Sequence, residues 1–310
     1  FFSAEVAAGR LTPALLPLQA GIGTIANAVL HGLLESSFSG MTMYSEVLQD
    51  SSFELLDSGQ FAFASASSIT LSAEMSRKFL DNVDIGDPVT MTDAYYAQGV
   101  DELVFYDIMA SAHDRGPTLD LVANVAKTIH IPFCVGGGIS TVEDIRATIK
   151  AGAEKVSLNS PAVRNPALIR EGAAIFGNQC IVLGMDAKRD PAMPSGYRVY
   201  INGGRVATEL DALEWALRAE ELGAGEIVLN SIDADGTRDG YEIPVTSLIS
   251  SRVSIPVIAS GGAGKPEHLA EVLTTGKADA ALIASMVHSG EYTVSSIKDS
   301  LAGQGIPVRR

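Results

Sequence analysis

Short apolar segments alternate with amphipathic segments along the chain from residue 101 onward. The apolar segments lack the polar alternation of half-exposed strands, which predicts parallel strands that are buried on both faces. Seven such strands are predicted, over residues 102–107, 131–135, 155–159, 180–186, 226–230, 256–260 and 280–284. Amphipathic helices are predicted between them, for example over 142–151, 211–222 and 266–275. The fold class is therefore α/β, either a (βα)8 barrel of the TIM type or an open doubly wound sheet.

An internal repeat favours the barrel. Residues 131–138 (IPFCVGGG) are echoed by residues 255–262 (IPVIASGG) at an offset of 124 positions, 255 − 131. Residues 102–104 (ELV) recur as 226–228 (EIV) at the same offset, 226 − 102. A common offset over two strands indicates a duplicated half-barrel, with four βα units in each half.

The same repeat indicates that the first strand of the barrel is missing or replaced. The strand at 180–186 opens the second half, so its counterpart is expected near residue 62, which is 186 − 124. Residues 60–65 (QFAFAS) contain no Asp and have no similarity to that strand. If the barrel closes, residues 60–67 are available as the eighth strand, but they would place no carboxylate opposite Asp186.

Residues 1–83 differ in composition from the alternating strands and helices that follow, because they are rich in Ser, Leu and Ala. A boundary is predicted at 82–87, a segment with turn chemistry. Pro88 then suits the first turn of a helix over 89–98. We therefore expect two domains, 1–83 and 84–310.

Composition and charge narrow the classes of function. Hydrophobic residues make up 46% of the chain, but no run of 18 apolar residues occurs, so no membrane-spanning helix is expected. The first residues lack the basic and apolar regions of a signal peptide, and the location is predicted to be cytoplasmic. Cys134 and Cys180 lie in apolar segments and are predicted to be reduced. A formal charge of −15 disfavours nucleic acid and anionic membranes as partners, so an anionic substrate needs local donors.

Glycine clusters follow two strands at equivalent positions of the repeat. Glycine lets backbone N–H groups approach an anion, and the start of the following helix adds its dipole. Two such clusters predict a substrate with a phosphate at each end. Small polar residues at the next strand ends complete two phosphate grips, although these residues can also cap helices. The first grip is Gly137, Gly138, Asn159 and Ser160, and the second grip is Gly261, Gly262, Ala284 and Ser285.

Asp186 is the leading catalytic candidate. It ends an apolar strand at the C-terminal rim of the predicted barrel, where such residues are commonly catalytic. A partly desolvated carboxylate at that position can transfer protons. The alternative is a structural salt bridge with Lys188 or Arg189.

Other charged residues have structural as well as functional interpretations. In the segment 231–237 (SIDADGT), Asp235 and Gly236 suit recognition of a substrate hydroxyl or simple loop structure. No metal is expected there, because the later bidentate Glu of a calcium loop is absent. Three charged residues at strand starts, on the opposite face, are interpreted as a stabilising ring: Glu102, Lys155 and Glu226.

Residues from about 84 to 310 closely resemble the cyclase subunit of imidazole glycerol phosphate synthase. The segments that carry the likeness are 101–108 (DELVFYDI), 135–139 (VGGGI), 185–189 (MDAKR), 231–237 (SIDADGT) and 259–265 (ASGGAGK). A related isomerase of histidine biosynthesis, the pathway to which this cyclase belongs, shares the phosphate-binding glycines, but it lacks the Asp-Ala-Lys-Arg element.

The resemblance implies a lyase of histidine biosynthesis that uses no cofactor. Ammonia from a glutamine amidotransferase subunit, the partner in a heterodimer, crosses the barrel and attacks a doubly phosphorylated ribulosyl-formimino-aminoimidazole carboxamide ribonucleotide. The products are imidazole glycerol phosphate and aminoimidazole carboxamide ribotide. Asp186 matches one of two acid–base aspartates, and both grips match phosphate sites. Asn230 and Asp235 match rim positions, and the predicted ring matches an ammonia gate.

The family's first strand has no counterpart in this chain. In the family that strand carries the other catalytic Asp, a gate Arg and a Lys beside the substrate. Cyclisation is therefore expected to be impaired.

Residues 4 to about 80 resemble part of the C-terminal domain of acetyl-CoA hydrolase and transferase proteins. The likeness lies in 5–6 (EV), 15–19 (LLPLQ), 21–23 (GIG), 26–29 (ANAV) and 44–50 (YSEVLQD). It implies Glu46 as the nucleophile that forms a glutamyl-CoA thioester, with backbone near Ile22 in the oxyanion hole. Three hypotheses stay open: a cyclase subunit, a CoA-transferase fragment, and an inactive hybrid. The join between the two likenesses fits a natural fusion, an engineered one or an assembly error.

Overall fold

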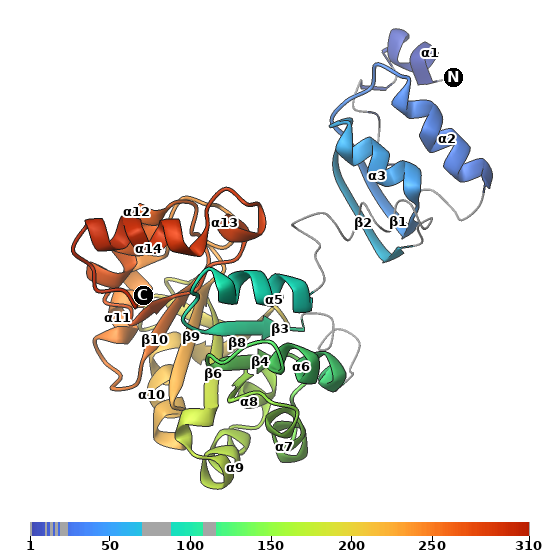
Figure 1. Cartoon of the computed structure of the whole chain (residues 1–310). Helices are drawn as coiled ribbons and strands as arrows, with labels where there is room; N and C mark the ends of the chain where they lie inside the picture. The colour runs from blue at the N-terminus through green and yellow to red at the C-terminus, as the bar shows by residue number, and fades with distance from the viewer. Residues whose placement is uncertain are drawn as a thin grey trace. The chain divides into compact units, whose positions relative to one another are not determined.

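The computed structural model describes residues 2–9, 11–12, 15, 18, 24–69, 88–107 and 116–309. The chain separates into two compact units, Phe1–Ile85 and Gly86–Arg310 (Figure 1). The domain boundary predicted at 82–87 falls outside the described residues. Among the helices described, none has both the length and the hydropathy needed to cross a bilayer.

The first unit contains a parallel pair of strands joined by a helix. Its elements are α1 (Phe2–Ala7), α2 (Thr24–Leu34), β1 (Met41–Leu48), α3 (Asp50–Asp57) and β2 (Phe61–Ile69). Buried side chains of α2, α3 and β1, such as Leu30, Leu55 and Met41, share one hydrophobic core. The side-chain amide of Gln60 donates to the backbone carbonyls of Leu33, Ser36 and Phe38. These hydrogen bonds anchor the start of β2 to the end of α2 and the loop that follows it.

The prediction that residues 60–67 supply an eighth barrel strand is wrong. β2 pairs in parallel with β1, with Met41 opposite Phe61, and both belong to a separate two-stranded sheet. The helix α3 is a short local crossover between them, and neighbouring strands in sequence commonly pair in this way. The backbone hydrogen bonds of β2 are therefore satisfied within the first unit.

The second unit is built from seven parallel strands that alternate with helices. The sheet runs in the order β11-β10-β9-β6-β5-β4-β3, with an antiparallel hairpin, β7–β8, added to β6. The strands are β3 (Leu103–Tyr106), β4 (Phe133–Gly136), β5 (Lys155–Leu158), β6 (Ile181–Arg189), β7 (Tyr197–Ile201), β8 (Val206–Asp211), β9 (Glu226–Ser231), β10 (Val257–Ser260) and β11 (Ala280–Ala281). The helices are α5 (Pro88–Ala97), α6 (Leu119–Ala126), α7 (Val142–Lys150), α8 (Ser160–Arg164), α9 (Ala167–Phe176), α10 (Ala212–Leu222), α11 (Ile243–Ser250), α12 (Pro266–Thr274), α13 (Ser285–His288) and α14 (Val294–Gly303). All seven predicted parallel strands are confirmed, whereas the hairpin was not predicted.

Alternate residues of the strands face two different apolar layers. Val182 of β6, Val228 of β9 and Cys134 of β4 form an inner cluster. Their neighbours, such as Leu183 and Ile227, pack against the helices in the largest core cluster. Figure 1 shows the helices arranged around the strands. This two-sided burial explains the absence of polar alternation in the strand sequences and confirms the TIM-type arrangement.

Local sequence signals set the helix ends that follow the strands. The side chain of Thr141 caps α7 and forms a capping box with Asp144. Asp211 caps α10, since its carboxylate accepts from the backbone N–H groups of Leu213 and Glu214. Gly223 ends α10 in a left-handed conformation, with a φ of 105°. These caps fix where each helix returns to the sheet.

The two ends of the seven-strand sheet are more exposed than its middle. All four residues of β4 are buried, whereas no residue of β3 is, and Tyr106 of β3 is 39% exposed. Within the described ranges, no further strand lies beyond β3 or β11 in this sheet. The first and last helices of the unit nevertheless meet, since Tyr95 of α5 contacts His288 of α13, and Gln98 accepts from the N–H of Val294. The ring is thus closed by its helices.

Candidate active site

A cavity of about 710 Å³ opens at the C-terminal ends of the parallel strands. Its walls come from β3, β4, β5, β6, β9 and β10 and from the segment after β11. The structure brings all twelve residues predicted as catalytic, phosphate-binding or rim positions to this one cavity: Gly137, Gly138, Asn159, Ser160, Asp186, Asn230, Asp235, Gly236, Gly261, Gly262, Ala284 and Ser285. Residues from seven separated strand ends meet here because the parallel strands all end on the same rim.

Asp186 is held between two side-chain amides. Asn159 Nδ2 donates to one carboxylate oxygen at 2.9 Å, and Asn230 Nδ2 donates to the other at 3.1 Å. These residues lie on β5 and β9, the two neighbours of β6 in the sheet. The carboxylate is therefore fixed in orientation and half-buried at the floor of the cavity.

The alternative of a structural salt bridge at Asp186 is not observed. Arg189 pairs instead with Glu242, and the Lys188 ammonium lies 6.0 Å from the centre of the Tyr200 ring. Asn159 also presents its Oδ1, a buried oxygen that has no hydrogen-bond partner among the described residues. An acceptor of this kind is available to a donor on a ligand.

The two glycine clusters have the same backbone conformation. Gly137 and Gly138 have φ values of 95° and 69°, and Gly261 and Gly262 have φ values of 89° and 103°. A Cβ on Gly137 would lie 2.3 Å from the carbonyl oxygen of Asp107. One on Gly262 would lie 2.0 Å from the carbonyl oxygen of Gly240. Both the left-handed backbone and the lack of space require glycine, so the repeat seen in the sequence extends to geometry.

The polar pairs after β5 and β11 also match each other. Asn159 and Ala284 precede α8 and α13 and have similar backbone angles, φ −115°, ψ −100° and φ −134°, ψ −77°. Ser160 is buried, and its hydroxyl oxygen accepts from the backbone N–H of Asn202 at 2.8 Å. Neither Asn159 nor Ala284 uses its side chain as a cap, so the capping interpretation of these pairs does not account for them.

The three predicted ring residues meet in one ion cluster at the N-terminal ends of the strands. Lys155 Nζ lies 2.8 Å from Glu102 Oε2 and 2.6 Å from Glu226 Oε1. Burial by itself would lower the pKa of Lys155, but the hydrogen bonds to both glutamates outweigh it and raise the pKa. The thiol of Cys134 lies deeper in the interior, where burial raises its pKa well above the ordinary value. Both Cys134 and Cys180 are free thiols, as predicted.

Several residues that line the cavity were missed from the sequence. They are Tyr106 and Ser157 on the strands, Asp107 directly after β3, Asn202, Gly203 and Arg205 on the β7–β8 hairpin, and Arg238. The hairpin had a recognisable signal, because the segment 202–204 (NGG) separates two runs with alternating polarity. The other residues carry no local signal, since only the fold turns them toward the cavity.

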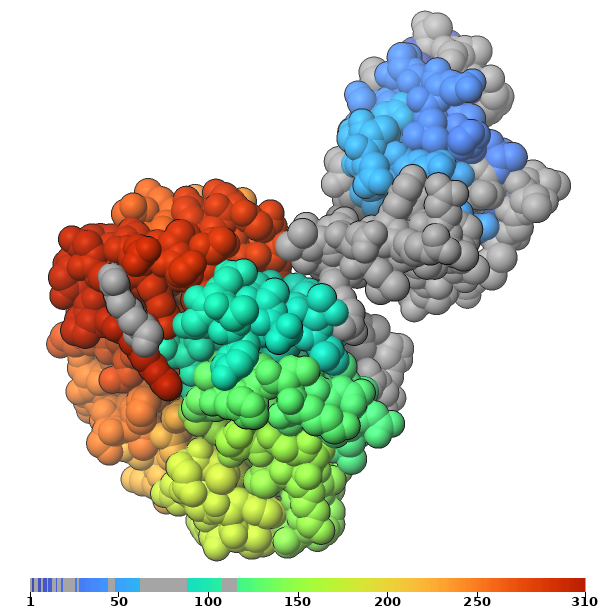
Figure 2. All heavy atoms as spheres, in the orientation of Figure 1, coloured from blue at the N-terminus to red at the C-terminus, as the bar shows by residue number. Residues whose placement is uncertain are grey.

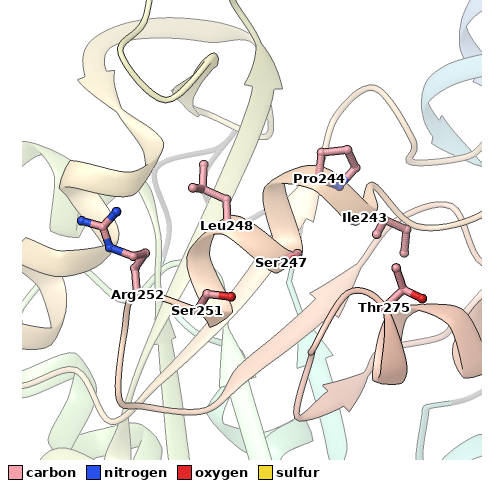
Figure 3. A pocket seen from close by; sticks show the side chains of 7 residues that line it. All are labelled: Ile243, Pro244, Ser247, Leu248, Ser251, Arg252 and Thr275. Atoms are coloured by element: carbon pink, nitrogen blue, oxygen red, sulfur yellow. The ribbon is translucent and has the colours of Figure 1, made fainter.

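A second pocket, of about 570 Å³, lies on the outside of the helical layer (Figure 3). The described residues that line it are Ile243, Pro244, Ser247, Leu248, Ser251, Arg252 and Thr275. None of these is a carboxylate or a predicted site residue. This pocket therefore presents none of the predicted catalytic or phosphate-binding residues.

Comparison with known proteins agrees with this geometry. A family model described as "Histidine biosynthesis protein" matches residues 72–293. The imidazole glycerol phosphate synthase subunit HisF of Desulforapulum autotrophicum is 63% identical over 236 residues, which is 75% of this chain and 91% of that relative. The HisF of Syntrophobacter fumaroxidans is 64% identical over 236 residues, with the same two coverages. The chain belongs to the HisF family.

The resemblance to the cyclase subunit is thereby confirmed for the second unit. The family match begins at residue 72, so it does not bear on the residues before it. The segment 21–23 and the side chain of Glu46 lie outside the described residues, and only the backbone of Glu46 is placed, on β1. The likeness of residues 4–80 to CoA-transferases, with Glu46 as nucleophile, stays a prediction without support.

Proposed function

We propose that this HisF-family chain joins ammonia to a doubly phosphorylated ribulosyl-formimino-aminoimidazole carboxamide ribonucleotide. The products are imidazole glycerol phosphate, aminoimidazole carboxamide ribotide and water. The observation that carries the proposal is the single cavity that holds two matching glycine turns and one oriented carboxylate. The turns belong to β4 and β10, with three strands between them, so a ligand with two terminal phosphates suits the spacing.

In this proposal Asp186 transfers protons during ring closure. The amides of Asn159 and Asn230 donate to its two oxygens and so hold it toward the reacting atoms. Each grip binds one phosphate through backbone N–H groups and a serine hydroxyl, Ser160 or Ser285. Asp235 and Gly236 line the rim, where they contact the sugar part of the substrate.

The opposite end of the barrel is proposed to receive ammonia from a glutamine amidotransferase subunit. Glu102, Lys155 and Glu226 form an ion cluster at that end, and Cys134, Val182 and Val228 form the apolar interior behind it. A neutral molecule such as ammonia crosses an apolar interior more easily than ammonium does. We also propose a cytoplasmic location, which the free thiols of Cys134 and Cys180 support.

We expect turnover below that of complete relatives. In the described part of the chain no strand lies between β3 and β11, so no first-strand carboxylate faces Asp186. Loss of one of two acid–base groups typically removes about 10²–10⁴-fold of the rate. The carboxylates of Asp107 and Asp235 also line the cavity and can take over part of this role.

The test is a turnover assay with the doubly phosphorylated substrate and ammonium salt, without any partner. Measurable formation of imidazole glycerol phosphate, at a rate reduced by roughly 10²–10⁴-fold from a complete HisF, is the expected result. Rates equal to those of a complete HisF would contradict the missing-acid argument. Absence of product together with absence of substrate binding would overturn the proposed function.

A further inference from the structure

The β7–β8 hairpin brings a cationic side chain to the cavity. β6 continues beyond Asp186, and its residues Asp186–Arg189 pair antiparallel with Tyr197–Tyr200 of β7. The tip of the hairpin, residues 202–205, follows β7, and Asn202, Gly203 and Arg205 from this tip line the cavity wall. The hairpin is therefore an extension of the catalytic strand itself.

Two contacts fix the tip, one to the first grip and one to the end of α8. The backbone N–H of Asn202 donates to the hydroxyl oxygen of Ser160, and the guanidinium of Arg164 donates to Asn202 Oδ1 at 2.5 Å. Asn202 has a φ of 56°, a conformation that asparagine tolerates better than most residues. Because Ser160 already accepts the N–H of Asn202, its hydroxyl proton remains available to a ligand in the cavity.

The charges that line the cavity leave one cation available. Among the described residues, three carboxylates line it, those of Asp107, Asp186 and Asp235, and they oppose the binding of an anion. Two arginines line it as well. Arg238 forms an ion pair with Glu291, whereas Arg205 has no ion pair within the described residues.

We propose that Arg205 binds the substrate phosphate held by the first grip. A guanidinium presents two parallel N–H donors that match two phosphate oxygens, and such charge-assisted bonds are stronger than those from neutral donors. The backbone N–H groups of the grip supply direction without a full charge, and Arg205 supplies the charge. This assignment deepens the proposed function and rests on it, since it takes the first grip as a phosphate site.

The test uses inorganic phosphate as the probe and equilibrium dialysis of the full chain as the measurement. R205Q is expected to weaken phosphate binding roughly tenfold to a hundredfold, because it loses a charge-assisted pair of hydrogen bonds. R205K keeps the positive charge but cannot form two parallel hydrogen bonds, so its phosphate affinity should lie between those of wild type and R205Q. The matched control is R218Q, on the exposed face of α10 and outside the cavity, which should bind as wild type does.

Two further measurements separate the possible outcomes. Near-ultraviolet circular dichroism checks that each variant is folded, and N202G, which keeps the left-handed backbone but frees the tip from Arg164, should weaken phosphate binding less than R205Q. Equal phosphate affinity in R205Q and wild type, or an equal loss in R218Q, would overturn the assignment. Binding that depends on Arg205 in a chain that forms no imidazole glycerol phosphate would leave the assignment standing and refute only the cyclase function.

Discussion

The ammonium group of Lys298 lies 2.7 Å from the carboxylate oxygen Oδ1 of Asp101, a residue 197 positions earlier in the chain. Lys298 belongs to α14, and Asp101 precedes β3, so the pair joins the last helix of the barrel unit to its first strand. Figure 2 shows α5 beside the C-terminal residues on the visible face. We call these contacts the helical seam: Tyr95 with His288, Gln98 with Val294, and Asp101 with Lys298. The seam closes the ring at the place where β3 and β11 do not pair.

Loosening the helical seam should free the first and last helices before the rest of the unit. In the double variant Q98A and K298M, the N–H of the buried Val294 loses its acceptor and the ion pair is lost. We expect the free energy of unfolding to fall by about 1–3 kcal/mol, with most of the loss from the unsatisfied N–H, since Asp101 is half exposed. Hydrogen exchange should accelerate in α5 and α14 first.

The matched control for the seam is K127M. The ammonium of Lys127 is exposed and, in the described part of the chain, donates to the exposed side chain of Asn124, so its removal should leave both stability and exchange unchanged. Exchange in α5 and α14 that stays as slow as in α9 and α10 in the double variant would show that the seam does not hold the ring.

Replacing Asp186 should remove turnover and leave phosphate binding in place. In D186N the side chain cannot transfer a proton, and its amide meets the donor groups of Asn159 and Asn230. A loss of about 10²–10⁴-fold in ammonia-dependent turnover is expected, measured at saturating substrate. E171Q, on the exposed face of α9, is the control. A D186N rate within a few-fold of that of E171Q would exclude Asp186 as the acid–base group.

The second glycine turn should tolerate no side chain. In G262A the new Cβ would lie 2.0 Å from the Gly240 carbonyl, in a left-handed backbone of φ 103°. Gly290 has a φ of 70° with open space around it, so G290A isolates the cost of the backbone alone, about 1–2 kcal/mol. We expect G262A to be clearly less stable than G290A in urea unfolding, and to lose phosphate binding that G290A keeps. Equal stability and equal phosphate binding in the two variants would mean that the turn at Gly262 can accommodate a side chain.

The ion cluster at the barrel entrance should give a pH-dependent stability. The hydrogen bonds from Lys155 to both glutamates raise its pKa, so its contribution is complete below the unfolded value of about 10.4 and disappears as pH rises through the folded value. K155M leaves Glu102 and Glu226 without their cation and should cost about 1–3 kcal/mol at pH 8. Thermal melts between pH 8 and pH 11 should show this difference shrinking toward high pH. A difference that stays constant or grows with pH would contradict the assignment.

The sequence predicted the strands and the two glycine turns well because both depend on local patterns. Residues buried on both faces produce continuous apolar runs, and glycines recur where Gly137 and Gly262 need a left-handed backbone. The pairing partner of the strand at residues 60–67 could not be predicted in this way. Their pattern fits any strand, and pairing with Met41 rather than with the barrel depends on a partner that the pattern does not specify.

The sequence by itself determined the seven parallel strands, the duplicated half-barrels and the place of Asp186 at a strand end. It did so because burial, turns and repeats each produce a pattern among residues that are close together in the sequence. Only the tertiary structure decided that Asn159 and Asn230 hold Asp186, that Asn202 of the hairpin tip donates to Ser160, and that helix contacts join the two ends of the described sheet. These relationships join residues that are far apart in the chain, and packing in three dimensions selects them.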